Sequence, residues 1–169
     1  MLKKGALAIM LMVASAGMLQ GCYSFSGGSL PGHLKSISIP VFDDRSGAGI
    51  AQFRGELTRA LTDRIESQSG LRVSPSAGRA DGTIEGAIVT FSDEPSQLSS
   101  KTDRAATNRI AIVVHAVMTD RVRKTTLFSQ SFAGFADYPS GNFMAQQQAV
   151  RFALGQIVDS MADRVVSGW

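Results

Sequence analysis

The strongest constraint on the fold is the segment RIAIVVHAVMTD, at positions 109–120. Its residues alternate with a period of two, which is typical of a β-strand whose successive side chains point to opposite faces of a sheet. One face carries Ile110, Ile112, Val114, Ala116 and Met118, and the other carries Ala111, Val113 and Val117. Because both faces are apolar, we expect this segment to be a central strand of a sheet.

Shorter segments with the same alternation predict the neighbouring strands. They are KSISIPVF at 35–42, with Ile37, Ile39 and Val41 on one face, GTIEGAIVTFSDEP at 82–95, and LFSQSFAGFADY at 127–138, while 71–76 suits one short strand. Pro40 has no backbone N–H, so the first of these strands is expected to lie at a sheet edge or to end in a bulge, and Pro95 is expected to end the second.

The connections are predicted from turn-forming and polar residues. The segment 43–49, DDRSGAG, is predicted to be a turn, and the polar segment 96–108 has no period and is predicted to be a loop. The segment 121–126, RVRKTT, is predicted to be a basic hairpin turn.

Two amphipathic helices are expected, at 50–70 and from about Asn142 to the end of the sequence, because apolar residues recur there every three or four positions. Their stripes are Ile50, Phe53, Leu57, Leu61 and Ile65 in the first, and Val150, Leu154, Ile157, Met161 and Val165 in the second. Gly70 is placed to stop the first helix. Gly155 either weakens the second helix or permits a close approach to the sheet.

The order of elements is therefore β-α-(β)-β-β-β-α, and two amphipathic helices need one apolar surface to cover. We predict an α+β fold, a two-layer sandwich with a mostly antiparallel sheet of about four strands. The single domain is expected to span 35–169, which is long enough for one hydrophobic core.

The N-terminus has the features of an export signal. Lys3 and Lys4 precede a short apolar run with small residues near its end, so 1–21 is predicted to be a signal peptide. Leu19-Gln20-Gly21-Cys22 resembles the bacterial lipobox, in which the cysteine is acylated and becomes the new N-terminus. The alternative is an ordinary signal peptide followed by a chance cysteine.

The segment that follows is consistent with a lipid anchor. Cys22 is the single cysteine of the chain, which excludes an intrachain disulfide. The Ser/Gly/Pro-rich segment up to residue 34 is predicted to be a flexible tether carrying the lipidated Cys22. Tyr23 after the cysteine is compatible with export to the outer membrane, where the protein would be lipid-anchored on the periplasmic side.

Composition and motifs exclude several function classes. Without Lys3 and Lys4 the 17 basic residues become 15, against 14 acidic ones, so no bulk charge favours nucleic acid. His33 is predicted in the tether and His115 in a strand, neither with a metal-ligand pattern. The Asp43-Asp44 pair is interpreted as turn chemistry. We therefore expect no enzyme, no metal and no cofactor.

Several segments together resemble one family. GCYSFSGGSLPGHLKSISIPVFDDRS, ADGTIEGAIVTFS and the final RVVSGW are similar, in this order, to the lipopolysaccharide-assembly lipoproteins, LptE. The resemblance implies an outer-membrane protein that partners the large β-barrel LptD, sits inside it, helps it fold and contacts lipopolysaccharide (LPS). It implies a role by binding rather than catalysis, and of the site residues it transfers only Cys22.

Candidate LPS contacts come from chemistry, because Arg and Lys pair well with phosphate oxygens. Arg121, Arg123 and Lys124 lie together on the predicted hairpin turn, and Lys101 and Arg104 lie in the predicted loop. The alternative is a solvated basic turn that keeps a sheet edge soluble. Trp169 is either an anchor in a partner or a residue packed on its own sheet.

Two other functions stay open at this point. ISIPVFDDRSG followed by an amphipathic helix also resembles the first domain of secretion-pore lipoproteins of the curli-export type. The chain lacks paired ten-residue segments that would suit membrane-spanning hairpins. The third option is a structural envelope lipoprotein without LPS contact.

Overall fold

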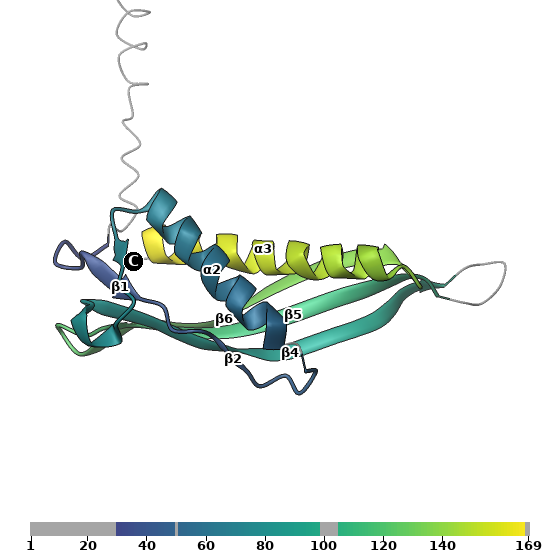
Figure 1. Ribbon diagram of the computed structural model, residues 1–169, viewed down its shortest axis with the longest axis horizontal. Coiled ribbons are helices and arrows are strands. Elements are labelled where there is room, and N and C mark those ends of the chain that lie inside the picture. Colours follow the sequence, from purple (N-terminus) through teal and green to yellow (C-terminus); the bar gives the residue numbers. More distant parts are fainter. Residues whose placement is uncertain (1–29, 50, 99–104, 168–169) are drawn as a thin grey trace, which may run out of the picture.

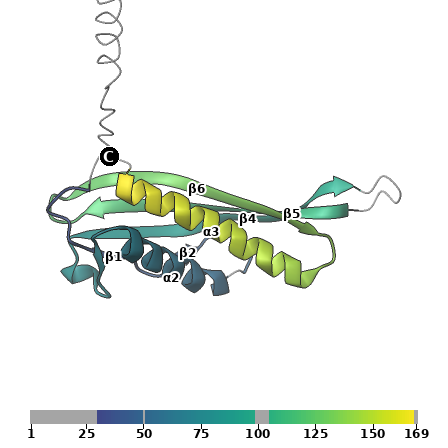
Figure 2. The same cartoon turned by 90° about the horizontal axis from the view of Figure 1, so that it is seen from above.

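The computed structural model describes residues 30–49, 51–98 and 105–167, and it confirms an α+β sandwich (Figures 1 and 2). The elements are β1 (Ser36–Ser38), β2 (Asp43–Asp44), α2 (Ala51–Gln68), β3 (Arg72–Val73), the 3-10 helix η2 (Ala77–Arg79), β4 (Gly82–Leu98), β5 (Ala105–Asp120), β6 (Thr125–Pro139) and α3 (Phe143–Ser167). Both helices lie on the same face of the sheet. Within the described ranges, no helix is long and apolar enough to cross a membrane.

The sheet has six strands rather than about four. Its order is β3-β1-β4-β5-β6, and β2 pairs with β4 beside β1. β4, β5 and β6 pair antiparallel, whereas β1, β2 and β3 join in parallel. The predicted turn at 43–49 contains β2, because a two-residue strand is too short to show an alternation.

The first predicted strand ends sooner than its alternation indicates. Ile37 and Ile39 are buried, but Val41 is 56% exposed and Phe42 enters the core in its place. The backbone N–H of Phe42 donates to Thr58 Oγ1 of α2 at 3.1 Å. β1 lies between β3 and β4 and not at the expected sheet edge, and Pro40, which has no N–H for a sheet ladder, lies beyond its end, where the alternation breaks.

β4 and β5 continue well beyond the predicted strand ends. Pro95 does not end β4, since it pairs with Asn108 of β5. The prediction of a loop over 96–108 is also wrong, because residues 96–98 belong to β4 and residues 105–108 belong to β5. β2 pairs with β4 only at Ala87 and Ile88, so β4 is an edge strand at Pro95 and a missing N–H there breaks no second ladder. Lys101 and Arg104 lie outside the described residues.

The core lies between the sheet and the two helices. The predicted stripes are confirmed: Phe53, Leu57, Leu61 and Ile65 of α2 and Val150, Leu154, Ile157, Met161 and Val165 of α3 are all buried, while Ile50 is outside the described residues. β5 is central in strand order, as predicted, and its Ile110 to Met118 face is fully buried. The opposite face of β5 is only half-buried.

Glycine determines how closely α3 approaches the sheet. A Cβ on Gly134 of β6 would lie 2.0 Å from the carbonyl oxygen of Ala153 in α3, whereas one on Gly155 would have no neighbour within 4 Å. The close approach that Gly155 was expected to permit is therefore made by Gly134 on the opposite element. Gly155 lies on the exposed side of α3.

Candidate functional site at the basic end of the sheet

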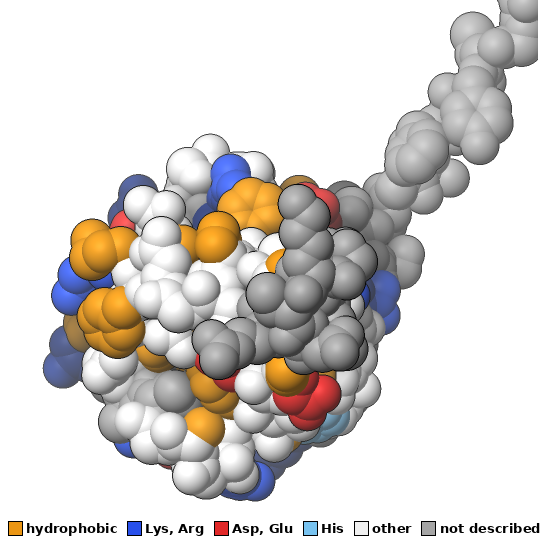
Figure 3. All heavy atoms as spheres, turned by 90° about the vertical axis from the view of Figure 1, so that its right-hand side faces the viewer, with side chains coloured by type: hydrophobic (Ala, Val, Ile, Leu, Met, Phe, Trp, Pro, Cys, Tyr) orange, Lys and Arg blue, Asp and Glu red, His pale blue; other side chains and the backbone are white. Residues whose placement is uncertain are grey.

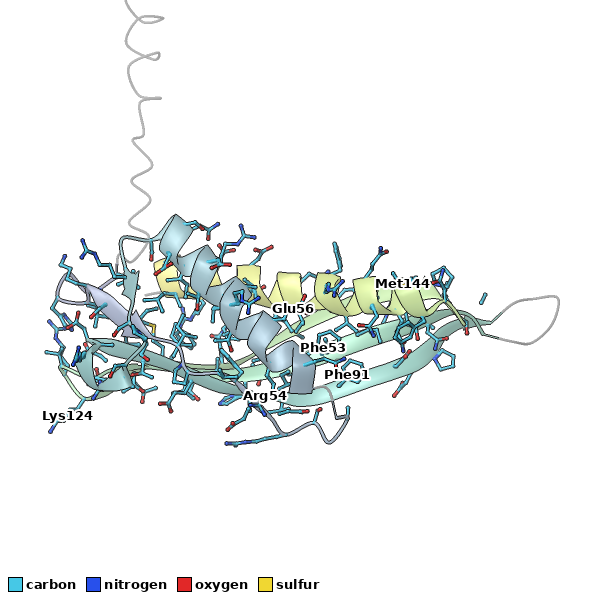
Figure 4. The ribbon with its side chains drawn as sticks, in the orientation of Figure 1. Phe53, Arg54, Glu56, Phe91, Lys124 and Met144 are labelled. Carbon is cyan, nitrogen blue, oxygen red and sulfur yellow. The ribbon has the colours of Figure 1, made fainter. Side chains whose placement is uncertain are left out.

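The turn between β5 and β6 is confirmed and is exposed throughout, from Arg121 to Lys124. Asp120 at the end of β5 shapes it, because its Oδ1 accepts the backbone N–H of Arg123 at 2.9 Å. Lys124 has a φ of 57°, the left-handed conformation that closes the turn. Figure 4 shows Lys124 pointing away from the body at one end of the molecule.

The three predicted cations of this turn are not equivalent. Arg121 is tied back to the body, since its N–H donates to the Asp81 carbonyl at 2.8 Å and its Nη1 to the Ala80 carbonyl at 3.4 Å. The side chains of Arg123 and Lys124 extend from the turn into solvent. These two are therefore the most available of the three to an anionic ligand.

A fully buried carboxylate beneath the turn is paired with the first described segment of the chain. His33 Nε2 lies 2.6 Å from Asp120 Oδ2. Burial would raise the pKa of Asp120, but the hydrogen bonds from Arg123 and His33 and the charge of His33 outweigh it and hold that pKa below its ordinary value. The sequence prediction put His33 in the tether and missed this contact, which joins residues 87 positions apart.

A second carboxylate fastens β1 to the start of β4. Asp81 Oδ2 accepts the backbone N–H groups of Lys35 and Ser36 and the Ser36 hydroxyl, each at 2.9 Å. These bonds, led by the one from Lys35, hold the pKa of Asp81 below its ordinary value. Asp81 Oδ2 therefore fastens Lys35 and Ser36, at the start of β1, to the residue that precedes β4.

Backbone hydrogen bonds bring further cations to the same end. Arg72 N–H donates to the Lys35 carbonyl at 3.0 Å, and Asp81 N–H donates to the Ser36 carbonyl at 3.0 Å. Together with the bond from Arg121 to Asp81, they link the ends of β3, β1, β4 and β5 in one row. We call the exposed cations on these strand ends the basic end: Lys35, Arg72, Arg79, Arg121, Arg123 and Lys124.

Half of the basic end was not predicted from the sequence. Lys35 and Arg72 meet the predicted turn because β3 pairs with β1 and β1 with β4, both in parallel, while Arg79 ends η2 shortly before β4. The signal that was available is that Lys35 stands directly before β1 and Arg72 at the start of β3. This signal is useful only when the order of the strands in the sheet is known, and the alternation of apolar and polar residues does not predict that order.

The other polar clusters have structural partners. His115 lies 3.3 Å from the hydroxyls of both Ser129 and Ser131 on the sheet face away from the helices. Asp44 accepts the N–H and hydroxyl of Ser46, as expected for turn chemistry. Among the described residues, no group of three or more His, Cys, Asp or Glu side chains is placed to hold a metal ion.

Asp93 organises the region where the β4–β5 hairpin leaves the body. Its carboxylate accepts the Tyr138 hydroxyl at 2.6 Å, Gln146 Nε2 at 2.6 Å and Asn108 Nδ2 at 3.1 Å. Burial, with Asp93 beside it, raises the pKa of Tyr138. The cluster joins β4, β5, β6 and the first turns of α3, which is a structural role.

The end of the molecule opposite the basic end has a different character. Exposed apolar side chains gather on β6 and the first half of α3, namely Phe135, Phe143, Met144 and Phe152. Phe135 and Phe152 flank a hollow of about 580 Å³ between these elements. Figure 3 looks onto this end, where hydrophobic side chains are plain and Lys and Arg lie toward the rim of the view. Figure 4 shows Met144 far from Lys124.

The fold itself occurs in other bacterial proteins. Three solved structures share the fold: lipoprotein B from Nitrosomonas europaea (TM-score 0.57, 16% identity, 83% of this chain and 86% of that one), a protein from Xanthomonas campestris (0.56, 12%, 82% and 90%) and a hypothetical protein from Chlamydia trachomatis (0.53, 12%, 78% and 93%). At these identities the likeness shows the fold alone. A search of curated proteins finds no match.

The family follows from the sequence. The sequence model of the LptE family, whose description is lipopolysaccharide-assembly, matches residues 34–167 of this chain, which is nearly all of the folded body. The chain belongs to this family, as the sequence resemblance predicted.

Proposed function

We propose that the protein is an outer-membrane lipoprotein, acylated at Cys22, that assists LPS assembly by binding. Its partners are the LPS-exporting barrel LptD and LPS itself, and it carries out no catalysis. The family match over 34–167 is the observation that carries this proposal. The described side chains support it, because their polar clusters have structural partners and six exposed cations lie together at one end.

The basic end is the proposed contact for LPS phosphates. Six exposed cations converge there, and the carboxylates beside them, Asp81, Asp120 and Glu66, each accept hydrogen bonds from neighbouring groups. Arg and Lys bind phosphate oxygens through charge-assisted hydrogen bonds. Arg123 and Lys124 are the central pair because their side chains extend from the turn.

The apolar patch at the other end is the proposed contact for the barrel. Contiguous exposed apolar residues on a folded protein are typical of interaction surfaces. Phe135 and Phe152 are 54% and 63% exposed beside the same hollow. The separation of the two surfaces permits a barrel and LPS to bind without competing.

The test is LPS capture by a charge-reversed variant, Arg121→Glu/Arg123→Glu/Lys124→Glu. Exposed charge pairs contribute up to about 1 kcal/mol each, so loss of three such contacts should raise the Kd for LPS by up to about a hundredfold at low salt. The fold should survive, because the turn is exposed. The readouts are LPS capture, circular dichroism, and co-purification with the barrel.

The matched control reverses three exposed cations away from the basic end, Arg45→Glu/Arg59→Glu/Arg151→Glu. It changes the net charge equally and should leave LPS capture close to that of the unaltered protein. If the turn variant keeps LPS capture but loses the barrel, the turn is a protein interface. If both triples reduce capture equally, the effect is one of net charge and the LPS site is elsewhere.

A further inference from the structure

The segment that leads to Cys22 meets the folded body at the basic end. The described chain begins at Leu30, and Leu34 N–H donates to the Pro31 carbonyl at 2.9 Å. Leu34 is buried in the core, and His33 is bonded to Asp120 under the basic turn. The point at which the N-terminal segment joins the body is therefore fixed beside the turn at 121–124.

The distance from this point to Cys22 is short. Seven residues lie between Cys22 and Leu30, so eight steps of at most about 3.5 Å limit the distance between them to roughly 28 Å. The sheet is longer than this, since the 15 residues of β6 extend about 50 Å at the usual rise of a strand. An anchored Cys22 is therefore within reach of the basic end and out of reach of the opposite end of the sheet.

The charges at this end suit an anionic surface. The basic end carries six exposed cations against three carboxylates, of which Asp120 is fully buried, Asp81 Oδ2 accepts hydrogen bonds from Lys35 and Ser36, and Glu66 accepts the Val73 N–H, so the balance is positive. Lys and Arg are attracted to anionic lipid headgroups when they lie within about a Debye length, roughly 8 Å. At the opposite end the exposed Arg109 is paired with Asp137, and hydrophobic side chains are plain (Figure 3).

We propose that the basic end docks on the anionic phospholipid headgroups of the leaflet that holds Cys22. The β4–β5 hairpin then lies at the end of the body that faces away from this leaflet. The His33–Asp120 pair keeps the anchored segment and the docking cations together. The inference uses the proposed acylation at Cys22 and is independent of the proposed contact with LPS.

The experiment measures which end lies near the headgroups. Acylation of Cys22 leaves no free thiol in the mature chain, so Ser76→Cys, next to η2 at the basic end, and Ser140→Cys, at the opposite end, can each be labelled with a fluorophore. The acylated protein is reconstituted in vesicles of phosphatidylcholine with 30 mol% phosphatidylglycerol, or of phosphatidylcholine alone, with an acceptor dye on a headgroup and no LPS. We expect stronger energy transfer from Ser76→Cys than from Ser140→Cys in the anionic vesicles only.

Neutral variants test whether the cations cause this orientation. Arg79→Gln/Arg123→Gln/Lys124→Gln should abolish the difference between the two labels, whereas Arg45→Gln/Arg59→Gln/Arg151→Gln should preserve it. With Cys22→Ser in place of the anchor, loss of three cations should weaken vesicle binding by about a hundredfold, and loss of the control set much less.

Three results would overturn the inference. The first is equal energy transfer from the two labels in anionic vesicles, and the second is the same difference between the labels in vesicles of phosphatidylcholine alone. The third is that the control triple variant reduces the difference as much as the basic-end triple variant does. If only vesicles with added LPS orient the protein, the phospholipid surface is not the partner, while the proposed LPS contact stands. If the protein orients on phospholipid but the charge-reversed turn still captures LPS, the LPS contact fails instead.

Discussion

Replacing Gly134 with alanine tests the contact that brings α3 onto β6. The added Cβ would lie 2.0 Å from the carbonyl oxygen of Ala153 and 3.1 Å from Ile157 Cγ1, and the first neighbour is backbone that cannot rotate away. Real Cβ atoms do not approach such a neighbour within 3.0 Å, so α3 has to move outward by about 1 Å. Overpacking of this kind costs about 3 kcal/mol, which corresponds to a fall in Tm of about 10 °C.

The matched control is the same substitution at Gly155 on the exposed side of the same helix. An added Cβ there has no neighbour within 4 Å, and alanine is favoured over glycine in a helix by up to about 1 kcal/mol. Gly155→Ala should therefore stabilise the protein. Urea unfolding of both variants on a soluble Cys22→Ala background gives the two free energies. Equal stability of Gly134→Ala and the parent would refute the close helix–sheet contact.

Three further predictions follow from burial, charge and the anchor. Leu61→Ala should cost about 2–5 kcal/mol in a denaturant titration, because Leu61 is fully buried, and a loss below about 0.5 kcal/mol would contradict its place in the core. The pKa of Asp120 is lowered in the folded protein, so its contribution to stability is present above its ordinary pKa near 3.8 and is lost as the pH falls through the lowered value. Asp120→Asn should therefore lower stability at pH 7 and flatten its dependence on pH below about 4, and an unchanged acid-unfolding curve would show that the carboxylate contributes nothing. Intact mass of the membrane-extracted protein should show acyl groups on Cys22, and an unmodified N-terminus downstream of residue 22 would contradict the anchor.

The sequence was sufficient to predict the parts of the fold that depend on repeated local patterns. The stripe from Phe53 to Ile65 and the alternation from Ile110 to Met118 each predict an element and the face that it buries. These patterns extend over several turns or residue pairs, so tertiary packing does not reverse them. The two-layer α+β architecture follows, because the buried faces have to cover one another.

The parts that were missed depend on pairing between distant residues. Pro95 is tolerated in β4 because its outer side has no neighbouring strand, which is visible only when strand order is known. His33 was placed in the tether because its neighbours are Gly and Pro, yet Asp120, far along the chain, provides its partner. The basic end was half predicted for the same reason: the hairpin turn is local, whereas Lys35 and Arg72 join it through parallel strands.

The most direct test of the account is purification of the acylated protein from detergent-solubilised membranes, with the mass and identity of the complex measured. The account predicts one large LPS-exporting β-barrel per copy of this chain, with LPS present in the complex. A homo-oligomeric ring, or a monomer without barrel or LPS, would contradict it.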